Sequence, residues 1–270
     1  MSDDLDPFGD LAESADHLID EVTGTPDPEH PPRPFTHDGS TLIVGERGTG
    51  ARTFVLVHGI GMGRKVFGDV ALHLERTGRV IAVDLPGYGE SPEPPRTPTI
   101  ERMADTVAAL LCAERIERPV LIGHSMGTQV VAEVEARHRL ASAVVLVAPT
   151  VNDRARRALT QLRLLVTDLL DESPKVLLLG AREYLRARPH LIRKTRAMLV
   201  HRPERTYPRI AVPVLVLRGE EDPVSPRDWC ERVVRALPHG EFVEVPGHGH
   251  ETMIRDGGPA ARRIVEWLGG

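Results

Sequence analysis

Short apolar runs alternate with segments of helical periodicity along most of the chain, and this alternation limits the possible folds more than any other feature. Short apolar runs predict buried strands, here at residues 41–44, 54–58, 80–84, 120–123, 143–147, 214–217 and 242–245. Apolar side chains every three or four positions predict helices, here at residues 100–116, 125–138, 226–237 and 260–268. This order is typical of an α/β protein with a mostly parallel central sheet and flanking helices. The run at 41–44 is expected to form an antiparallel edge.

Residues 150–209 interrupt the alternation. They show helical spacing, for example at Leu159, Leu162 and Leu165, and no clear strand pattern. A helical insertion between two strands of a parallel sheet is well placed to cover a site at the strand ends. We therefore expect a core of residues 34–149 and 210–270, with residues 150–209 as a helical cap or lid.

The first 33 residues are expected to be a disordered tail outside this core. Residues 1–32 carry ten acidic side chains and neither Lys nor Arg, and five prolines fall within residues 25–34. Proline at this density disfavours regular structure. Residues 150–210 hold 14 basic and 6 acidic side chains. One hypothesis is that the acidic tail lies on this basic segment.

Composition excludes several classes of protein. Aromatic residues make up only 4% of the chain, and no nucleic-acid-binding motif accompanies the basic segment, so a nucleic-acid partner is not expected. No apolar run is long enough to span a membrane, and the N-terminus lacks the pattern of a signal peptide. Two cysteines, Cys112 and Cys230, suggest neither a disulfide framework nor a zinc site. These features predict a cytoplasmic protein without metal, cofactor or membrane partner, and they leave its oligomeric state open.

The clearest chemical motif is the sequence Gly-His-Ser-Met-Gly at residues 123–127, which fits the pattern G-x-S-x-G. It follows an expected strand and opens an expected helix. A sharp strand-to-helix turn would push the hydroxyl of Ser125 out of the sheet, and the two glycines would let neighbouring backbone pass closely. The helix N-terminus behind the serine favours developing negative charge. Ser125 is therefore the predicted nucleophile.

Two further turns complete a recognisable set. Residues 58–61 read His-Gly-Ile-Gly after an expected strand, and residues 84–91 read Asp-Leu-Pro-Gly-Tyr-Gly-Glu-Ser. In this order, the motifs resemble those of the α/β-hydrolase fold family over about residues 35–270. The resemblance implies an α/β-hydrolase fold. It also implies a structural role for Asp84 and an oxyanion hole formed by the backbone N–H groups of Ile60 and Met126.

The same resemblance suggests the acid and the base. Residues 219–223 read Gly-Glu-Glu-Asp-Pro, and the family pattern places the acid at Asp222, ahead of Glu220, Glu221 and the more distant Asp153. Residues 246–250 read Pro-Gly-His-Gly-His, which offers two histidines. The family pattern places the base at His250 and leaves His248 at a variable position. The chain order serine, aspartate, histidine fits this family.

Other side chains near these motifs are candidates for lining the substrate pocket. They are Met62, His124 and His248. The glycine-rich run at residues 59–63 lacks the spacing of a nucleotide-binding loop and a following Lys-Ser or Lys-Thr pair. No nucleotide cofactor is therefore expected.

Together the motifs predict a carboxylesterase-like serine hydrolase that cleaves a small or medium carboxylic ester, or a thioester, through an acyl-enzyme on Ser125. A hydrolase of carbon–carbon bonds of the meta-cleavage type and a haloperoxidase-like or perhydrolase enzyme would use the same three residues, so both remain alternatives. The alternative from another class is a ligand-binding scaffold of this fold. The complete set of nucleophile, acid, base and oxyanion loop argues against it.

Overall fold

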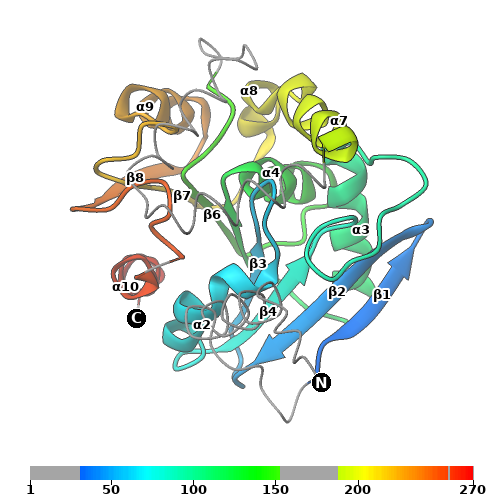
Figure 1. Cartoon of the computed structure of the whole chain (residues 1–270). Coiled ribbons are helices and arrows are strands. Elements are labelled where there is room, and N and C mark those ends of the chain that lie inside the picture. Colours follow the sequence, from blue (N-terminus) through cyan, green and yellow to red (C-terminus); the bar gives the residue numbers. More distant parts are fainter. Residues whose placement is uncertain (1–30, 153–187, 255, 270) are drawn as a thin grey trace, which may run out of the picture.

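The computed structural model describes residues 31–152, 188–254 and 256–269. Within them an eight-stranded sheet has the order β1-β2-β4-β3-β5-β6-β7-β8 (Figure 1). The strands are β1 (Arg33–His37), β2 (Ser40–Arg47), β3 (Thr53–Val57), β4 (Arg79–Asp84), β5 (Val120–His124), β6 (Ala143–Val147), β7 (Val214–Gly219) and β8 (Gly240–Val245). Strands β3 to β8 run parallel, whereas β1 and β2 pair antiparallel at one edge. The predicted mostly parallel sheet is confirmed.

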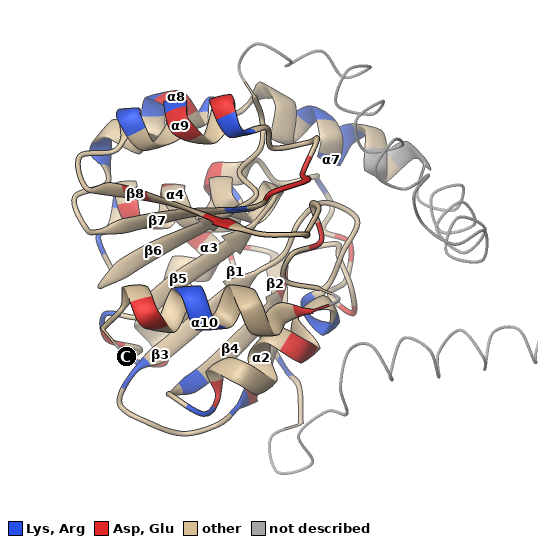
Figure 2. Ribbon diagram, turned by 90° about the vertical axis from the view of Figure 1, so that its left-hand side faces the viewer, with Lys and Arg blue, Asp and Glu red and all other residues tan. Residues whose placement is uncertain are grey.

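Helices cover both faces of this sheet (Figure 2). On one face lie α3 (Ile100–Ala113), α4 (Met126–His138) and α9 (Arg227–Ala236), whose buried side chains belong to one apolar cluster with that side of the sheet. On the other face lie α2 (Gly68–Leu74) and α10 (Gly257–Trp267), which pack into a second cluster. The central strands are buried on both faces, which explains why their sequences read as continuous apolar runs.

The long helix α3 illustrates how the sequence determines an element. The hydroxyl of Thr99 accepts a hydrogen bond from the N–H of Arg102 and so caps the helix start. One face of the helix, which includes Met103, Val107 and Leu110, is buried in the first apolar cluster. The amphipathic pattern read from the sequence therefore matches the buried face.

Three elements were not predicted from the sequence. The sheet begins at β1, with Arg33 paired to Val44, rather than at residue 41, so the expected tail boundary at residue 33 falls inside a strand. Pro34 is tolerated because β1 is an edge strand, where a missing N–H costs no ladder bond. Helix α2 and the 3₁₀ turn η1 (Arg64–Phe67) lie between β3 and β4, where no helix was predicted.

The described part of the insertion is helical, as the sequence predicts. It contains α7 (Arg188–Val200), α8 (Pro203–Thr206) and the 3₁₀ turn η3 (Tyr207–Arg209). Residues 153–187 and 1–30 lie outside the described residues, and so does the predicted contact between the acidic tail and the basic segment. No helix within the described ranges has the length and apolar composition needed to cross a bilayer.

The parallel strands bring distant parts of the sequence to one edge of the sheet. The loops after β3, β5, β7 and β8 all leave the carboxyl ends of neighbouring strands. In open α/β sheets this edge is where binding and catalytic groups collect. Ser125, Asp222 and His250 follow three of these strands, so the topology gathers the residues that the motifs singled out.

Candidate active site

Ser125 occupies a sharp turn between β5 and α4. Its backbone has φ 52° and ψ −117°, a strained conformation for a residue with a side chain, and the residue is only 4% exposed. The two flanking glycines are sterically required. A Cβ on Gly127 would lie 2.1 Å from the carbonyl oxygen of Val57, and a Cβ on Gly123 would lie 2.4 Å from the carbonyl oxygen of Gly127. The motif therefore encodes close backbone contact as well as a serine.

Asp222 and His250 are joined by a direct hydrogen bond. The Nδ1–H of His250 donates to Oδ2 of Asp222 at 2.9 Å, and both side chains are buried. The second carboxylate oxygen, Oδ1, accepts hydrogen bonds from the N–H groups of Val224 at 2.8 Å and Ser225 at 2.9 Å. Burial alone would raise the pKa of Asp222, but His250 and these backbone donors lower it below its usual value. The carboxylate thus stays charged beside the imidazole.

His124 connects this pair to the turn at Ser125. Its ring is fully buried, and Nε2–H donates to the backbone carbonyl of His250 at 2.8 Å. Burial, and next the neighbouring His250, lower the pKa of His124 to about 3. His124 immediately precedes Ser125, so the loop that carries His250 lies against the serine turn. The side chain proposed from sequence as a pocket candidate is instead engaged beneath the site.

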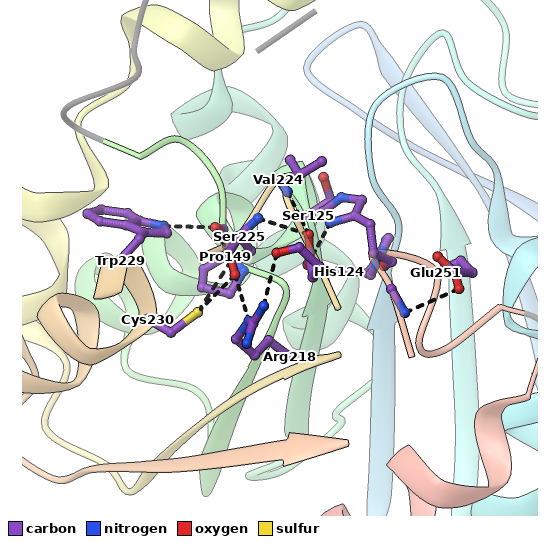
Figure 3. A network of polar contacts seen from close by, with 12 residues as sticks. His124, Ser125, Pro149, Arg218, Val224, Ser225, Trp229, Cys230 and Glu251 are labelled. Atoms are coloured by element: carbon purple, nitrogen blue, oxygen red, sulfur yellow. Dashed lines mark hydrogen bonds and ion pairs between the residues drawn. The ribbon is translucent and has the colours of Figure 1, made fainter. Parts of the chain in front are cut away.

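The turn that carries Asp222 is tied to the loop after β6. The hydroxyl of Ser225 donates to the carbonyl of Pro149 at 2.9 Å, and the indole N–H of Trp229 donates to the same oxygen at 2.8 Å (Figure 3). Both donors are buried. One carbonyl therefore fixes both the turn and the first residues of α9 to the neighbouring strand end.

The loop after β3 approaches the serine from another side. A Cβ on Gly59 would lie 3.0 Å from the Cβ of Ser125, so the backbone at residue 59 passes directly beside Ser125. The loop is held by His58, whose Nδ1–H donates to the Gly59 carbonyl at 2.7 Å while Nε2 accepts the N–H of Leu85 at 3.0 Å. Burial lowers the pKa of His58 to about 4, which keeps one ring nitrogen free to accept.

A family profile completes the assignment of the fold. The sequence profile of the alpha/beta hydrolase family matches residues 54–262, most of the chain. The chain belongs to this family.

Individual relatives agree with that assignment. A protein of Mycobacterium phage D29 named "Putative non-heme haloperoxidase" is 30% identical over 260 residues, which cover 84% of this chain and 91% of that protein. The AB hydrolase superfamily protein YisY of Bacillus subtilis strain 168 is 26% identical over 249 residues, covering 82% and 92%. The solved enol-lactonase from Burkholderia xenovorans LB400 superposes with a TM-score of 0.73 at 21% identity, over 88% of this chain and all of that one. The last similarity shows the shared fold.

Met62 and His248 are the remaining pocket candidates of this α/β hydrolase. His248 is partly buried, its Nδ1–H donates to the Pro246 carbonyl at 2.8 Å, and Nε2 lies 3.6 Å from Asp256. Met62 is partly buried, and its sulfur lies 3.4 Å from the position that a Cβ on Gly59 would take. The structure thus brings Met62 close to the loop beside Ser125. The ring of His248 contacts Pro246 and Asp256, and its backbone carbonyl accepts a hydrogen bond from the N–H of Glu221 at 2.9 Å.

The other acidic side chains named from the sequence differ from Asp222 in exposure or in their contacts. Glu220 and Glu221 are exposed, and Asp153 lies outside the described residues. Asp84 accepts a hydrogen bond from the N–H of Glu90 at 3.0 Å and pairs with the guanidinium of Arg64 in a buried contact. These contacts fit the structural role expected for Asp84. Within the described residues, no three His, Cys, Asp or Glu side chains are grouped so that they could hold a metal ion.

One buried charge near the site is not among the candidates named from the sequence. Arg218 ends the apolar run of β7 and packs beneath the turn that carries Asp222. A charged side chain inside an otherwise apolar strand is rarely buried without partners. A solvent-facing arginine would not be expected in a central strand. The place of Arg218 at the end of an apolar run was therefore the sequence signal that could have identified it.

Proposed function

We propose that this α/β hydrolase is a serine hydrolase that cleaves a small or medium carboxylic ester, or a thioester, through an acyl-enzyme on Ser125. The observation that carries the proposal is the 2.9 Å hydrogen bond between Asp222 and His250, formed next to a serine in a strained turn. A serine hydroxyl is a weak nucleophile alone and needs an adjacent base that is itself oriented by a third group. The three residues supply these parts.

In the proposed first step, Nε2 of His250 takes the proton of the Ser125 hydroxyl as its oxygen attacks the substrate carbonyl. The imidazole then carries a positive charge, which the Asp222 carboxylate stabilises across the Nδ1–H hydrogen bond. His250 next returns the proton to the leaving alcohol or thiol, and the acyl group remains on Ser125. Because the pKa of Asp222 is lowered, the carboxylate is ionised when this charge develops.

The negative charge on the carbonyl oxygen requires donors of its own. We propose the backbone N–H groups of Ile60 and Met126 for this role. Met126 is the first residue of α4, where N–H groups have no carbonyl one turn earlier in the helix, and the helix dipole favours negative charge there. Residue 60 follows Gly59, which passes close to Ser125. Loss of one such donor typically costs about 3–4 kcal/mol of transition-state stabilisation.

Water completes the proposed cycle. His250 removes a proton from a water molecule as the water attacks the acyl carbonyl. His250 then gives this proton to the oxygen of Ser125 as the acid leaves, so the serine hydroxyl is restored. In this proposal the core of residues 34–149 and 210–270 carries the reacting groups, and residues 150–209 act as the cap over them. The substrate is a small molecule that presents one activated carbonyl.

A chain-length series of p-nitrophenyl esters, from acetate to dodecanoate, tests the proposal. We expect turnover with an optimum at one acyl length, its loss in Ser125→Ala and His250→Ala, and its retention in His248→Ala. The matched histidine variants separate the proposed base from its neighbour two residues away. Turnover that survives in Ser125→Ala would contradict the proposal. Acyl thioesters extend the series if the oxygen esters react slowly.

The 30% identity to a protein named as a haloperoxidase favours a second candidate, peracid formation. In this variant, hydrogen peroxide replaces water and attacks the acyl group on Ser125, which releases a peracid and regenerates the serine. The peracid then oxidises bromide. Bromination of a phenol that requires peroxide, acetate and bromide, and that disappears in Ser125→Ala, is the expected result. Bromination that persists in Ser125→Ala would exclude this route.

A further inference from the structure

Arg218 lies beneath the turn that carries Asp222. It is only 5% exposed, and it is the second-last residue of β7. The turn that follows spans residues 219–226 and leads into α9. A buried guanidinium needs several acceptors, because each unsatisfied donor would lose its hydration without replacement.

The acceptors are the backbone carbonyls of this one turn. Nε of Arg218 donates to the carbonyl of Ser225 at 2.8 Å (Figure 3). Nη2 donates to the carbonyls of Glu220 and Asp222, each at 3.0 Å. Nη1 donates to the carboxylate of Glu244 on β8. A planar fork of donors can hold three carbonyls at fixed relative positions, whereas the single ammonium of a lysine cannot reproduce that geometry.

Backbone N–H groups of the same turn hold the Asp222 carboxylate. The N–H groups of Val224 and Ser225 donate to its Oδ1, which leaves Oδ2 directed at His250. Arg218 therefore holds three carbonyl groups of this turn, while two N–H groups of the same turn hold the Asp222 carboxylate. The peptide groups that accept from Arg218 are neighbours, along the turn, of those that donate to Oδ1, so loss of the Arg218 contacts is expected to shift the donors as well.

The charge of Arg218 is balanced outside the turn. Glu244 pairs with Arg218 through one oxygen and with the exposed Arg227 of α9 through the other. Arg218 itself contacts the carbonyl of Asp222 and not its carboxylate. Its influence on Asp222 is therefore one of geometry, passed through the backbone.

We propose that Arg218 is a positioning residue that sets the direction of the Asp222 carboxylate and, through it, of the His250 ring. The proposal rests on the proposed function, in which these two residues serve Ser125. Arg218 does not touch substrate in this account. It acts only through the turn at residues 219–226.

The test compares Arg218→Met and Arg218→Lys with Arg227→Met, a control that removes the other guanidinium on Glu244 and leaves the turn contacts in place. Ester turnover is measured from pH 5 to pH 9 and normalised to active sites titrated with a fluorophosphonate. We expect kcat per active site to fall at least tenfold in both Arg218 variants, with KM within about twofold, and to stay unchanged in Arg227→Met. Since His250 loses part of its carboxylate partner, the acid limb of the profile is expected to move to lower pH.

A purely structural role gives a different pattern. It would lower the titrated fraction of active sites and the melting temperature, but leave kcat per active site and the acid limb unchanged, and that result would overturn the proposal.

A second readout needs no substrate. The proton shared by His250 Nδ1 and Asp222 is expected to give a low-field NMR resonance, assigned by its loss in His250→Gln. We expect it to move or vanish in Arg218→Lys, which keeps the buried charge, and to persist in Arg227→Met. An unchanged resonance in both Arg218 variants would overturn the positioning role even if the protein hydrolyses no ester. Absence of turnover with a displaced resonance would instead contradict the proposed function alone.

Discussion

The Nε2–H of His124 donates a 2.8 Å hydrogen bond to the backbone carbonyl of His250, although 126 residues separate the two in sequence. Their ring centroids lie 5.1 Å apart. His124 directly precedes Ser125, so this bond fastens the loop after β8 to the turn that presents the serine. Burial keeps the His124 ring neutral, and a neutral ring has one donor for this carbonyl.

The burial of His124 predicts a pH-dependent stability. The pKa of His124 is about 3 in the folded protein but returns to about 6.5 on unfolding, so the unfolded chain binds the extra proton. Stability is therefore lost as pH falls below 6.5, by about 1.4 kcal/mol for this group between pH 7.5 and pH 5.5. Urea unfolding at both pH values is expected to show a smaller pH dependence in His124→Asn than in wild type. The exposed control His239→Asn is expected to match wild type, and equal pH dependence in all three proteins would contradict the account.

Alanine substitution of Gly127, in the serine turn, is expected to lower the free energy of unfolding more than alanine substitution of Gly39, in the turn between β1 and β2. In Gly127→Ala the new Cβ would meet the Val57 carbonyl at 2.1 Å, and both β3 and α4 are packed too tightly to move freely. We expect a loss of about 3 kcal/mol or more. In Gly39→Ala nothing lies within 4 Å of the new Cβ, and only the left-handed backbone at φ 71° is strained, at about 1–2 kcal/mol. Denaturant unfolding measures both, and comparable losses would argue against the steric explanation.

Removal of the Lys194 charge is expected to let helix α7 open locally more often. Lys194 is almost fully buried, pairs with Glu93 at 2.7 Å, donates to the Gly87 carbonyl, and lies over the ring of Tyr88. We expect Lys194→Met to remove this donor from the Gly87 carbonyl and from Glu93, which keeps its contact with His190 at 3.1 Å, and to speed amide hydrogen exchange across α7.

A surface pair provides the control for this measurement. Lys65 is largely exposed and pairs with Glu90 at 3.2 Å, so Lys65→Met is expected to leave exchange in α7 unchanged. Exchange in α7 that is the same in Lys194→Met and wild type would show that other contacts hold the helix.

The sequence predicted the fold well where the pattern is repeated and strong. Strands buried on both faces, such as β5 and β6, read as continuous apolar runs, and the glycines around Ser125 mark a turn that few other residues could form. The edge strand β1 is different because three of its five residues are exposed and it contains Pro34, so it carries no apolar run. Helix α2 has only seven residues, too few for a convincing helical period, although Val70, Ala71 and Leu74 form its buried face.

The site was predictable to the extent that its residues belong to local motifs. The bond between Asp222 and His250 joins two such motifs, so each residue could be named from its own turn. The roles of Arg218 and His124 could not be read in this way. Arg218 also pairs with Glu244, but the contacts that define both roles are made to backbone carbonyls. Every residue has a backbone carbonyl, and no sequence pattern records which one a side chain will reach.

The central claim is that His250 activates Ser125. The most direct measurement is the rate at which a fluorophosphonate labels the protein, with the modified residue located by peptide mass spectrometry. We predict a single label on Ser125 in wild type and at a similar rate in His248→Gln, and labelling at least 100-fold slower in His250→Gln. Labelling at another residue, or an unchanged rate in His250→Gln, would contradict the claim.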